Sequence, residues 1–138
     1  MMRIRLTAEF GLSRGIMGLS IRDNDGGAYP TPQFHPGVNY IELEVNAPKT
    51  LIFTVIGKHT RDTVVDPNTG KIVRDKYINI TNVEVDGKPL KPETVMDLFL
   101  CKTWHHGESK SAFWAFEGNV EFEIPYSDPL DWHLASLA

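Results

Sequence analysis

The stretch NYIELEV, residues 39–45, has the alternation of a β-strand that is buried on one face only. Ile41, Leu43 and Val45 share one phase, whereas Glu42 and Glu44 share the other. Successive side chains of a strand point to opposite faces of a sheet, so this pattern puts an apolar face on a core and a charged face in water. The stretch therefore predicts an antiparallel sheet with one solvated side.

The same period of two recurs along the chain, with turn residues roughly every 8 to 12 residues. Further strands are predicted for residues 2–8, 16–22, 51–57 and 76–85. In the last of these the apolar phase slips at Thr81 and Asn82, which predicts a β-bulge. We therefore predict an all-β fold: a single antiparallel, jelly-roll-like β-sandwich of about eight strands, with residues 1–138 as one domain.

Turn chemistry predicts the connections. VVDPNTGKIV (64–73) is predicted to be a hairpin, because Pro and Gly suit its turn. AYPTPQFHPG (28–37) holds three prolines and is predicted to be a surface excursion. PETVMDLFLCK (92–102) fits a short helix or a strand equally well. AFWAF (112–116) and NVEFEIP (119–125) are predicted to pair as a hairpin across EGN.

SDPLDWHLASL, residues 127–137, is predicted to be a short C-terminal helix. Asp128 would cap it and Pro129 would take its first position. Leu130, Leu134 and Leu137 would then share a face. We expect Trp132, Leu134 and Leu137 to be buried against the sandwich or a neighbouring subunit.

The chain has 138 residues, 41% apolar and 23% charged, which is an ordinary globular composition. It has 14 basic and 18 acidic side chains, and no Lys or Arg follows Lys110. Such a surface repels phosphate backbones, so we predict no nucleic-acid partner. No apolar run has the length of a membrane span or a signal peptide, so we predict no membrane contact and synthesis in a cytoplasm.

CKTWHHGESKSAFWAFEGN, residues 101–119, combines a thiol, two histidines and two tryptophans. Structural zinc needs four N or S ligands, commonly in paired short spacings, and the other histidines form no such pair. We predict that Cys101 is a buried apolar residue and that no metal is bound. Glu121 and Glu123 share one strand face, whereas a glycosidase needs two carboxyl groups on either side of a bond. We predict no catalytic residues and no enzyme.

Two loops resemble parts of a calcium site. DNDGG (23–27) and DPNTG (66–70) alternate oxygen-bearing side chains and end in glycine, but both lack the distal glutamate of an EF-hand. We predict turns and no cofactor. Calcium is the alternative, if Asp62, Asp66 or Asp75 come together in space.

Trp104 and Trp114 flank the polar loop of this segment. An exposed indole beside histidines can stack on a sugar, whereas a buried indole belongs to a core or an interface. We predict that Trp114 is structural. The predicted ligand- or partner-binding residues are Trp104, His105, His106 and Trp132.

Residues 51–90, LIFTVIGKHTRDTVVDPNTGKIVRDKYINITNVEVDGKPL, resemble two groups of proteins. The first is a family of small β-sandwich virion proteins of tailed bacteriophages. This resemblance implies a non-enzymatic structural or interaction module: a capsid decoration or tail-associated protein, assembled in the host cytoplasm into an oligomer with other virion subunits.

DKYINITNVEVDG, residues 75–87, is also similar to a segment of calcium-dependent xylan-binding carbohydrate-binding modules. That resemblance implies the alternative function: a carbohydrate-binding module with a glycan as its partner and calcium as its cofactor. Trp104, Trp114, His105, His106 and either Asp62 or Asp75 would then lie near the sugar. Only Asp75 stands at a position that matches the metal-binding aspartates of those modules.

Overall fold

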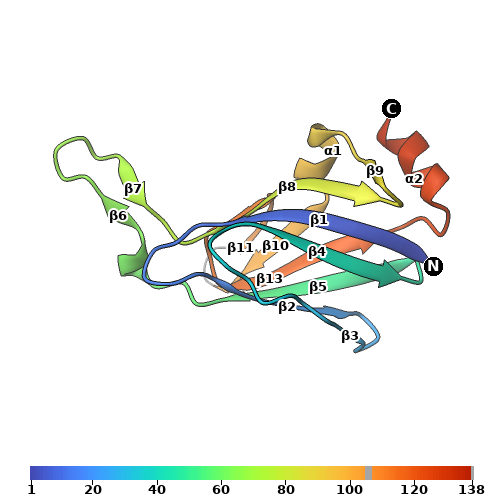
Figure 1. The fold of residues 1–138 in the computed structure, drawn as a ribbon, viewed down its shortest axis with the longest axis horizontal. Coiled ribbons are helices and arrows are strands. Elements are labelled where there is room, and N and C mark those ends of the chain that lie inside the picture. Colours follow the sequence, from blue (N-terminus) through green and yellow to red (C-terminus); the bar gives the residue numbers. More distant parts are fainter. Residues whose placement is uncertain (105–106, 138) are drawn as a thin grey trace.

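The computed structural model describes residues 1–104 and 107–137, apart from the side chain of Thr60. Two antiparallel sheets pack into a β-sandwich, which confirms the predicted all-β class (Figure 1). Sheet A has the order β12-β8-β1-β4, with β9 paired to β8. Its strands are β1 (Met2–Phe10), β4 (Gly37–Val45), β8 (Ile78–Val85), β9 (Lys88–Pro89) and β12 (Phe113–Trp114).

Sheet B has the order β11-β10-β13-β5-β2-β3. Its strands are β2 (Gly18–Asp23), β3 (Ala28–Tyr29), β5 (Lys49–Ile56), β10 (Phe99–Thr103), β11 (Gly107–Lys110) and β13 (Gly118–Ile124). The remaining elements are the 3-10 turn η1 (Thr60–Asp62), β6 (Val64–Val65), β7 (Ile72–Arg74), α1 (Pro92–Asp97) and α2 (Pro129–Ser136).

The predicted alternation builds the core. In β4 the side chains of Ile41, Leu43 and Val45 are buried, and β1 buries every second side chain in the same way. β1 lies between β4 and β8 in sheet A, with antiparallel pairing on both sides. The inward-facing side chains of sheet A therefore pack on those of sheet B and form one hydrophobic core.

The predicted β-bulge is confirmed at Thr81. Thr7 of β1 pairs with Asn82, whereas the next residue, Ala8, pairs with Ile80. Thr81 is therefore the extra residue of β8, and it is exposed. The bulge lets the apolar residues on both sides of it face the core, although they occupy opposite phases of the sequence.

The predicted hairpin of residues 112–125 is wrong. β12 pairs with β8 in sheet A, whereas β13 pairs with β5 and β10 in sheet B, so the chain crosses the sandwich between them. Gly118 lies at the end of this crossing, where a Cβ would stand only 2.4 Å from the carbonyl oxygen of Lys102. Trp114 enters the core at the crossing, and it is fully buried against Phe53 and Phe99.

Residues 92–102 use both predicted conformations in succession, first α1 and then β10. The C-terminal helix α2 is confirmed, and the carboxylate of Asp128 accepts a hydrogen bond from the backbone N–H of Leu130. The expected burial is confirmed for Trp132. It is not found for the leucines of α2 in this chain, because Leu134 and Leu137 are exposed.

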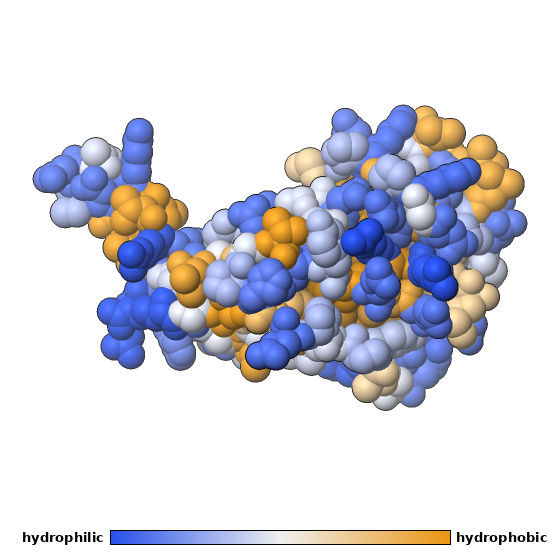
Figure 2. All heavy atoms as spheres, in the orientation of Figure 1, coloured by the Kyte–Doolittle hydropathy of each residue, from blue (hydrophilic) through white to orange (hydrophobic). Residues whose placement is uncertain are grey.

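The predicted hairpin of residues 64–73 is confirmed as β6 and β7, which form a two-stranded sheet of their own. It projects from the end of the sandwich opposite α2 (Figure 1). Figure 2 shows apolar side chains gathered on this projection, where Val64, Val65, Ile72 and Val73 are exposed. No helix among the described residues is long and apolar enough to cross a membrane.

Candidate functional site

The solvated side of sheet A carries the polar phase of three adjacent strands, and we call it the outer face of sheet A. β1 lies in the middle of this face, with β4 on one side and β8 on the other. Helix α1 contacts β8. The residues of the outer face are Arg3, Arg5, Thr7, Glu9, Val38, Tyr40, Glu42, Glu44, Asn79, Asn82 and Glu84.

Arg5 and Tyr40 form a stacked pair near the centre of this face. The Arg5 guanidinium carbon lies 4.2 Å from the centroid of the Tyr40 ring, which is the geometry of a cation–π contact. Nε of Arg5 lies 3.8 Å from a carboxylate oxygen of Glu42, and Glu84 is the cross-strand neighbour on the other side. This Nε is buried and has no hydrogen-bond partner among the described residues. Tyr40 is 51% exposed, so the part of its ring that Arg5 does not cover is available to a ligand.

The next row of the outer face adds neutral polar groups. Thr7 lies directly opposite Tyr40 of β4 and opposite Asn82 of β8. Directly opposed side chains in antiparallel strands stand about 5 Å apart at Cβ. A hydroxyl, a phenol and a carboxamide are therefore placed in one row, beside the guanidinium of Arg5.

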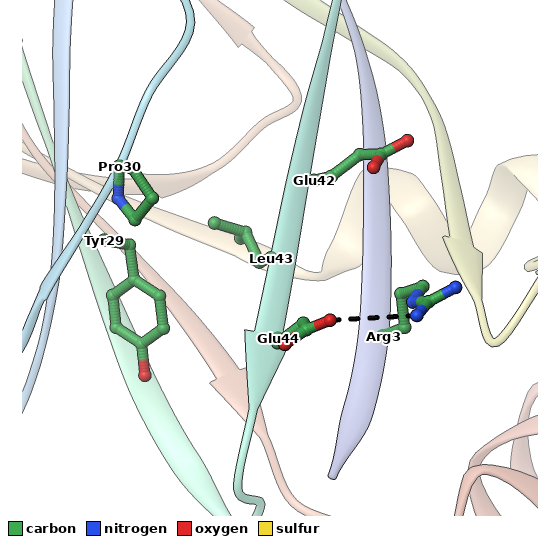
Figure 3. A pocket seen from close by; sticks show the side chains of 6 residues that line it. All are labelled: Arg3, Tyr29, Pro30, Glu42, Leu43 and Glu44. Carbon is green, nitrogen blue, oxygen red and sulfur yellow. Dashed lines mark ion pairs between the residues drawn. The ribbon is translucent and has the colours of Figure 1, made fainter.

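A hollow of about 500 Å³ continues this face around the free edge of β4. Leu43 points towards Tyr29 and Pro30, whereas the side chains of Glu42 and Glu44 point to the other side of β4, over β1 (Figure 3). The Tyr29 hydroxyl donates a hydrogen bond of 3.1 Å to Asp23, which holds the ring in place. The volume of the hollow falls within the range of about 300–1,000 Å³ that is usual for small-ligand sites.

The structure does not bring the predicted site residues together. Trp104 follows β10 and is 54% exposed, as predicted for a surface residue. His105 and His106 lie outside the described residues. Trp114 is buried in the core, so the two indoles do not share a surface. Trp132 is only 3% exposed and packs on Phe122 at a centroid distance of 5.9 Å, which removes it from the surface that a partner could touch.

Sequence reasoning missed Arg5, Tyr40 and Asn82. The available signal was the polar phase of the strands at 2–8 and 39–45, where basic residues of one match acidic residues of the other. The structure pairs them as Arg3 with Glu44 and Arg5 with Glu42, at 3.7 and 3.8 Å.

Two of the residues considered for catalysis, Cys101 and Glu121, have contacts of other kinds. Cys101 is fully buried, and burial raises the pKa of its thiol to about 11. A thiol with so high a pKa is a poor nucleophile at neutral pH. Glu121 lies 2.9 Å from the ammonium of Lys102 in a surface ion pair.

The aspartates of the hairpin base are each held by a lysine. Asp62 is 1% exposed, and its carboxylate lies 3.5 Å from the ammonium of Lys76. A hydrogen bond from the backbone N–H of His59, together with Lys76, holds the pKa of Asp62 below its usual range. Asp75 pairs with Lys58. Burial raises the pKa of Asp75, but hydrogen bonds from Lys58 and Thr63 outweigh it, so this pKa is also lowered.

The two loops that resemble parts of a calcium site are turns, as predicted. Oδ1 of Asp23 accepts hydrogen bonds from the backbone N–H groups of Asp25 and Gly27. Its other oxygen lies 3.2 Å from the ammonium of Lys49. The carboxylate of Asp66 accepts a hydrogen bond from the N–H of Asn68 within the tip of the projecting hairpin.

No protein-family model and no curated protein matches this sequence. Two solved structures share the fold. One is the selenomethionine form of vCBM60, from work on two families of calcium-dependent carbohydrate-binding modules linked by circular permutation. It has 11% identity and a TM-score of 0.57, over 89% of this chain and 91% of that chain. The other is vCBM60 in complex with galactobiose, with 10% identity and a TM-score of 0.55, over 88% of this chain and 97% of that chain. At such low identity the similarity establishes the fold.

The calcium dependence of those modules raises the question of whether this chain could hold the same ion. Calcium takes six to eight oxygen ligands, several of them carboxylates. Among the described residues no three His, Cys, Asp or Glu side chains converge as a metal site. The buried carboxylates already carry ammonium partners. The residues that the structure describes therefore do not fit a calcium site.

Proposed function

We propose that this chain is a non-catalytic module that binds carbohydrate on the outer face of sheet A. The observation that carries the proposal is the exposed Arg5–Tyr40 stack, which has hydroxyl, amide and carboxylate side chains as neighbours. The fold supports it, because a solved protein of the same fold is in complex with galactobiose.

The chemistry of the outer face suits a sugar. A pyranose ring has an apolar face, which can pack on the part of the Tyr40 ring that Arg5 does not cover, and a fringe of hydroxyl groups. Those hydroxyls can accept hydrogen bonds from Arg5, and they can both donate hydrogen bonds to Thr7 and Asn82 and accept them from these side chains. The Arg5 guanidinium is held in place by Tyr40 and Glu42, so little side-chain entropy remains to be lost on binding.

The charges of the outer face favour a neutral glycan. Both arginines already lie close to a glutamate of β4, at 3.7 and 3.8 Å. Glu9 and Glu84 add further negative charge, and the whole chain has a net charge of −4. A uronic acid or a sulfated sugar would meet this acidic surface at contact distance, where salt screens little. We therefore place neutral oligosaccharides first.

A glycan array that contains neutral, uronic-acid and sulfated oligosaccharides tests the proposal, followed by calorimetric titration of the best ligand. We expect binding to a neutral glycan. Tyr40→Ala should weaken it about tenfold or more, which corresponds to about 1.4 kcal/mol of binding free energy. Trp104→Ala is the matched control, because its ring is similarly exposed but lies on a loop away from this face.

Absence of any glycan ligand would reject the carbohydrate function. Loss of binding with Trp104→Ala, but not with Tyr40→Ala, would move the site to the loop after β10. Binding of acidic glycans alone would retain the function and reject the preference for neutral sugars.

The second candidate is a structural or interaction module, such as a component of a bacteriophage virion that contacts other subunits in its assembly. The projecting β6–β7 hairpin favours it, since four exposed β-branched side chains on a two-stranded sheet are typical of a contact surface. Light scattering of the purified chain at increasing concentration distinguishes the two. Association that Val65→Thr and Val73→Thr abolish would favour this second function.

A further inference from the structure

The base of the projecting hairpin is held by two lysine ammonium groups that lie among oxygen atoms. Nζ of Lys76 donates a hydrogen bond of 2.7 Å to the carbonyl oxygen of Gly57 and lies 3.5 Å from the Asp62 carboxylate. Nζ of Lys58 contacts the carboxylate of Asp75 and donates a hydrogen bond of 2.9 Å to the carbonyl oxygen of Lys76. Each ammonium therefore has one carboxylate and one backbone carbonyl as partners.

Carboxylates and backbone carbonyls are also the ligands that calcium takes in proteins. Here these oxygens surround a side-chain cation that the chain itself supplies. Lys76 is only 6% exposed, and a lysine is rarely so buried without a partner that compensates its charge. Asp62 compensates it and at the same time accepts the backbone N–H of His59, so the pair closes the 57–62 loop.

The two pairs join segments that are distant in the sequence. Lys58 connects the end of β5 to Asp75, after β7, and Thr63 donates a second hydrogen bond to the same carboxylate. Lys76 connects the start of β8 to Gly57 and Asp62. The entry and exit of the projecting hairpin are therefore fastened to each other and to sheet B, as a metal ion that bridges loops would fasten them.

We infer that Lys58 and Lys76 take the place of a bound cation in this chain, so that neither its folding nor its ligand binding requires calcium. The part that concerns folding stands on the ion pairs alone. The part that concerns ligand binding rests on the proposed carbohydrate function. A third ammonium neutralises a buried carboxylate at the opposite end of the sandwich, where Lys49 lies 3.2 Å from Asp23 and 3.7 Å from Asp25.

The test is the melting temperature of the full chain in EDTA and in millimolar calcium. We expect the same value in both buffers. Lys58→Met and Lys76→Met should each lower it by several degrees in both buffers, because each leaves a carboxylate without its counter-charge. Lys88→Met is the matched control, since Lys88 is exposed on β9 and should tolerate the change.

A reversible rise of several degrees on addition of calcium to the wild type would overturn the inference, and this measurement needs no variant to fold. The inference would also be overturned if Lys58→Met and Lys76→Met had the same melting temperature as Lys88→Met. Titration of the neutral glycan in both buffers separates the two proposals. Binding that needs calcium would reject the inference and keep the carbohydrate function, whereas absence of binding in both buffers would reject that function and leave the folding test decisive.

Discussion

Trp114→Ala should remove much of the free energy of unfolding, because this indole fills the core where the chain crosses from sheet A to sheet B. The side chain is fully buried. Its ring makes edge contacts with Phe99 and Phe53, at centroid distances of 5.3 and 5.7 Å. Its Nε1–H donates a hydrogen bond of 2.8 Å to the carbonyl oxygen of Ser111.

The magnitude follows from these contacts. Truncation of a buried Phe or Trp to Ala costs about 3–5 kcal/mol. Two aromatic pairs, each about 0.5–1.5 kcal/mol beyond the buried area, place Trp114 at the upper end of that range. The lost hydrogen bond adds little, because the Ser111 carbonyl oxygen also accepts a contact from the Cys101 thiol at 3.4 Å. A loss of about 5 kcal/mol lowers the melting temperature of a domain of this size by roughly 10 to 20 °C.

Urea unfolding followed by far-ultraviolet circular dichroism measures this loss without relying on tryptophan fluorescence. Trp114→Phe keeps a ring in the core and should lose less than about 3 kcal/mol, so it remains measurable if the alanine variant does not fold. Trp104→Ala is the control and should stay within about 0.5 kcal/mol of the wild type. If Trp114→Ala unfolds at the same urea concentration as Trp104→Ala, then the Trp114 side chain does not fill the core between the sheets.

Two further predictions concern acid and the C-terminal helix. Hydrogen bonding, chiefly from the backbone N–H of Gly27, lowers the pKa of Asp23 from 3.8 to about 2. This carboxylate therefore stabilises the fold above about pH 4, and the stabilisation is lost as the pH falls towards 2. The melting temperature should be constant from pH 7 to 5 and should fall below pH 4. If the melting temperatures of the wild type and of Asp23→Asn fell in parallel with pH, this prediction would be contradicted. Trp132→Ala should cost about 3 kcal/mol by thermal or urea unfolding, because the indole packs on Phe122, and an unchanged midpoint would show that α2 is only loosely attached.

The sequence predicted those parts of the fold that depend on neighbouring residues. Alternation over 39–45 placed Ile41, Leu43 and Val45 in the core, because the period of a strand is a local property. The bulge at Thr81 and the cap at Asp128 were also predicted, since a slip of phase and a Ser-Asp-Pro start are visible within a few residues.

The pairing of β12 could not be predicted in this way. EGN between two apolar segments has the composition of a hairpin turn, and sequence alone favours pairing of neighbours. The structure instead pairs Phe113 with Asn79, which is 34 positions earlier, and the neighbouring Trp114 enters the core between the sheets. A strand can pair with its neighbour along the chain or with a distant strand, and the choice depends on which side chains each pairing buries. The pattern of residues within one short segment does not contain that information.

The candidate site depends on register in the same way. The residues that drew attention in the sequence, Trp104, His105 and His106, are unusual because they are adjacent along the chain. Arg5 and Tyr40 are 35 positions apart, and each is ordinary where it stands. Only the antiparallel pairing of β1 with β4 brings the guanidinium over the ring.

The similarity to vCBM60 concerns the fold, whereas the contacts of the aspartates in this chain concern what the fold can bind. At 11% identity the two chains share a fold, and a shared fold does not imply the same site. A cation that ties loops together can then be exchanged for a lysine, provided that the carboxylates stay neutralised, and Lys58 and Lys76 meet that condition. If Lys58 and Lys76 take the place of a cation, as we infer, a sugar is not bound at this end of the sandwich through a metal. On the proposed function it is held by direct contacts on the outer face of sheet A, where Tyr40 has an exposed ring and lies in one row with Thr7 and Asn82.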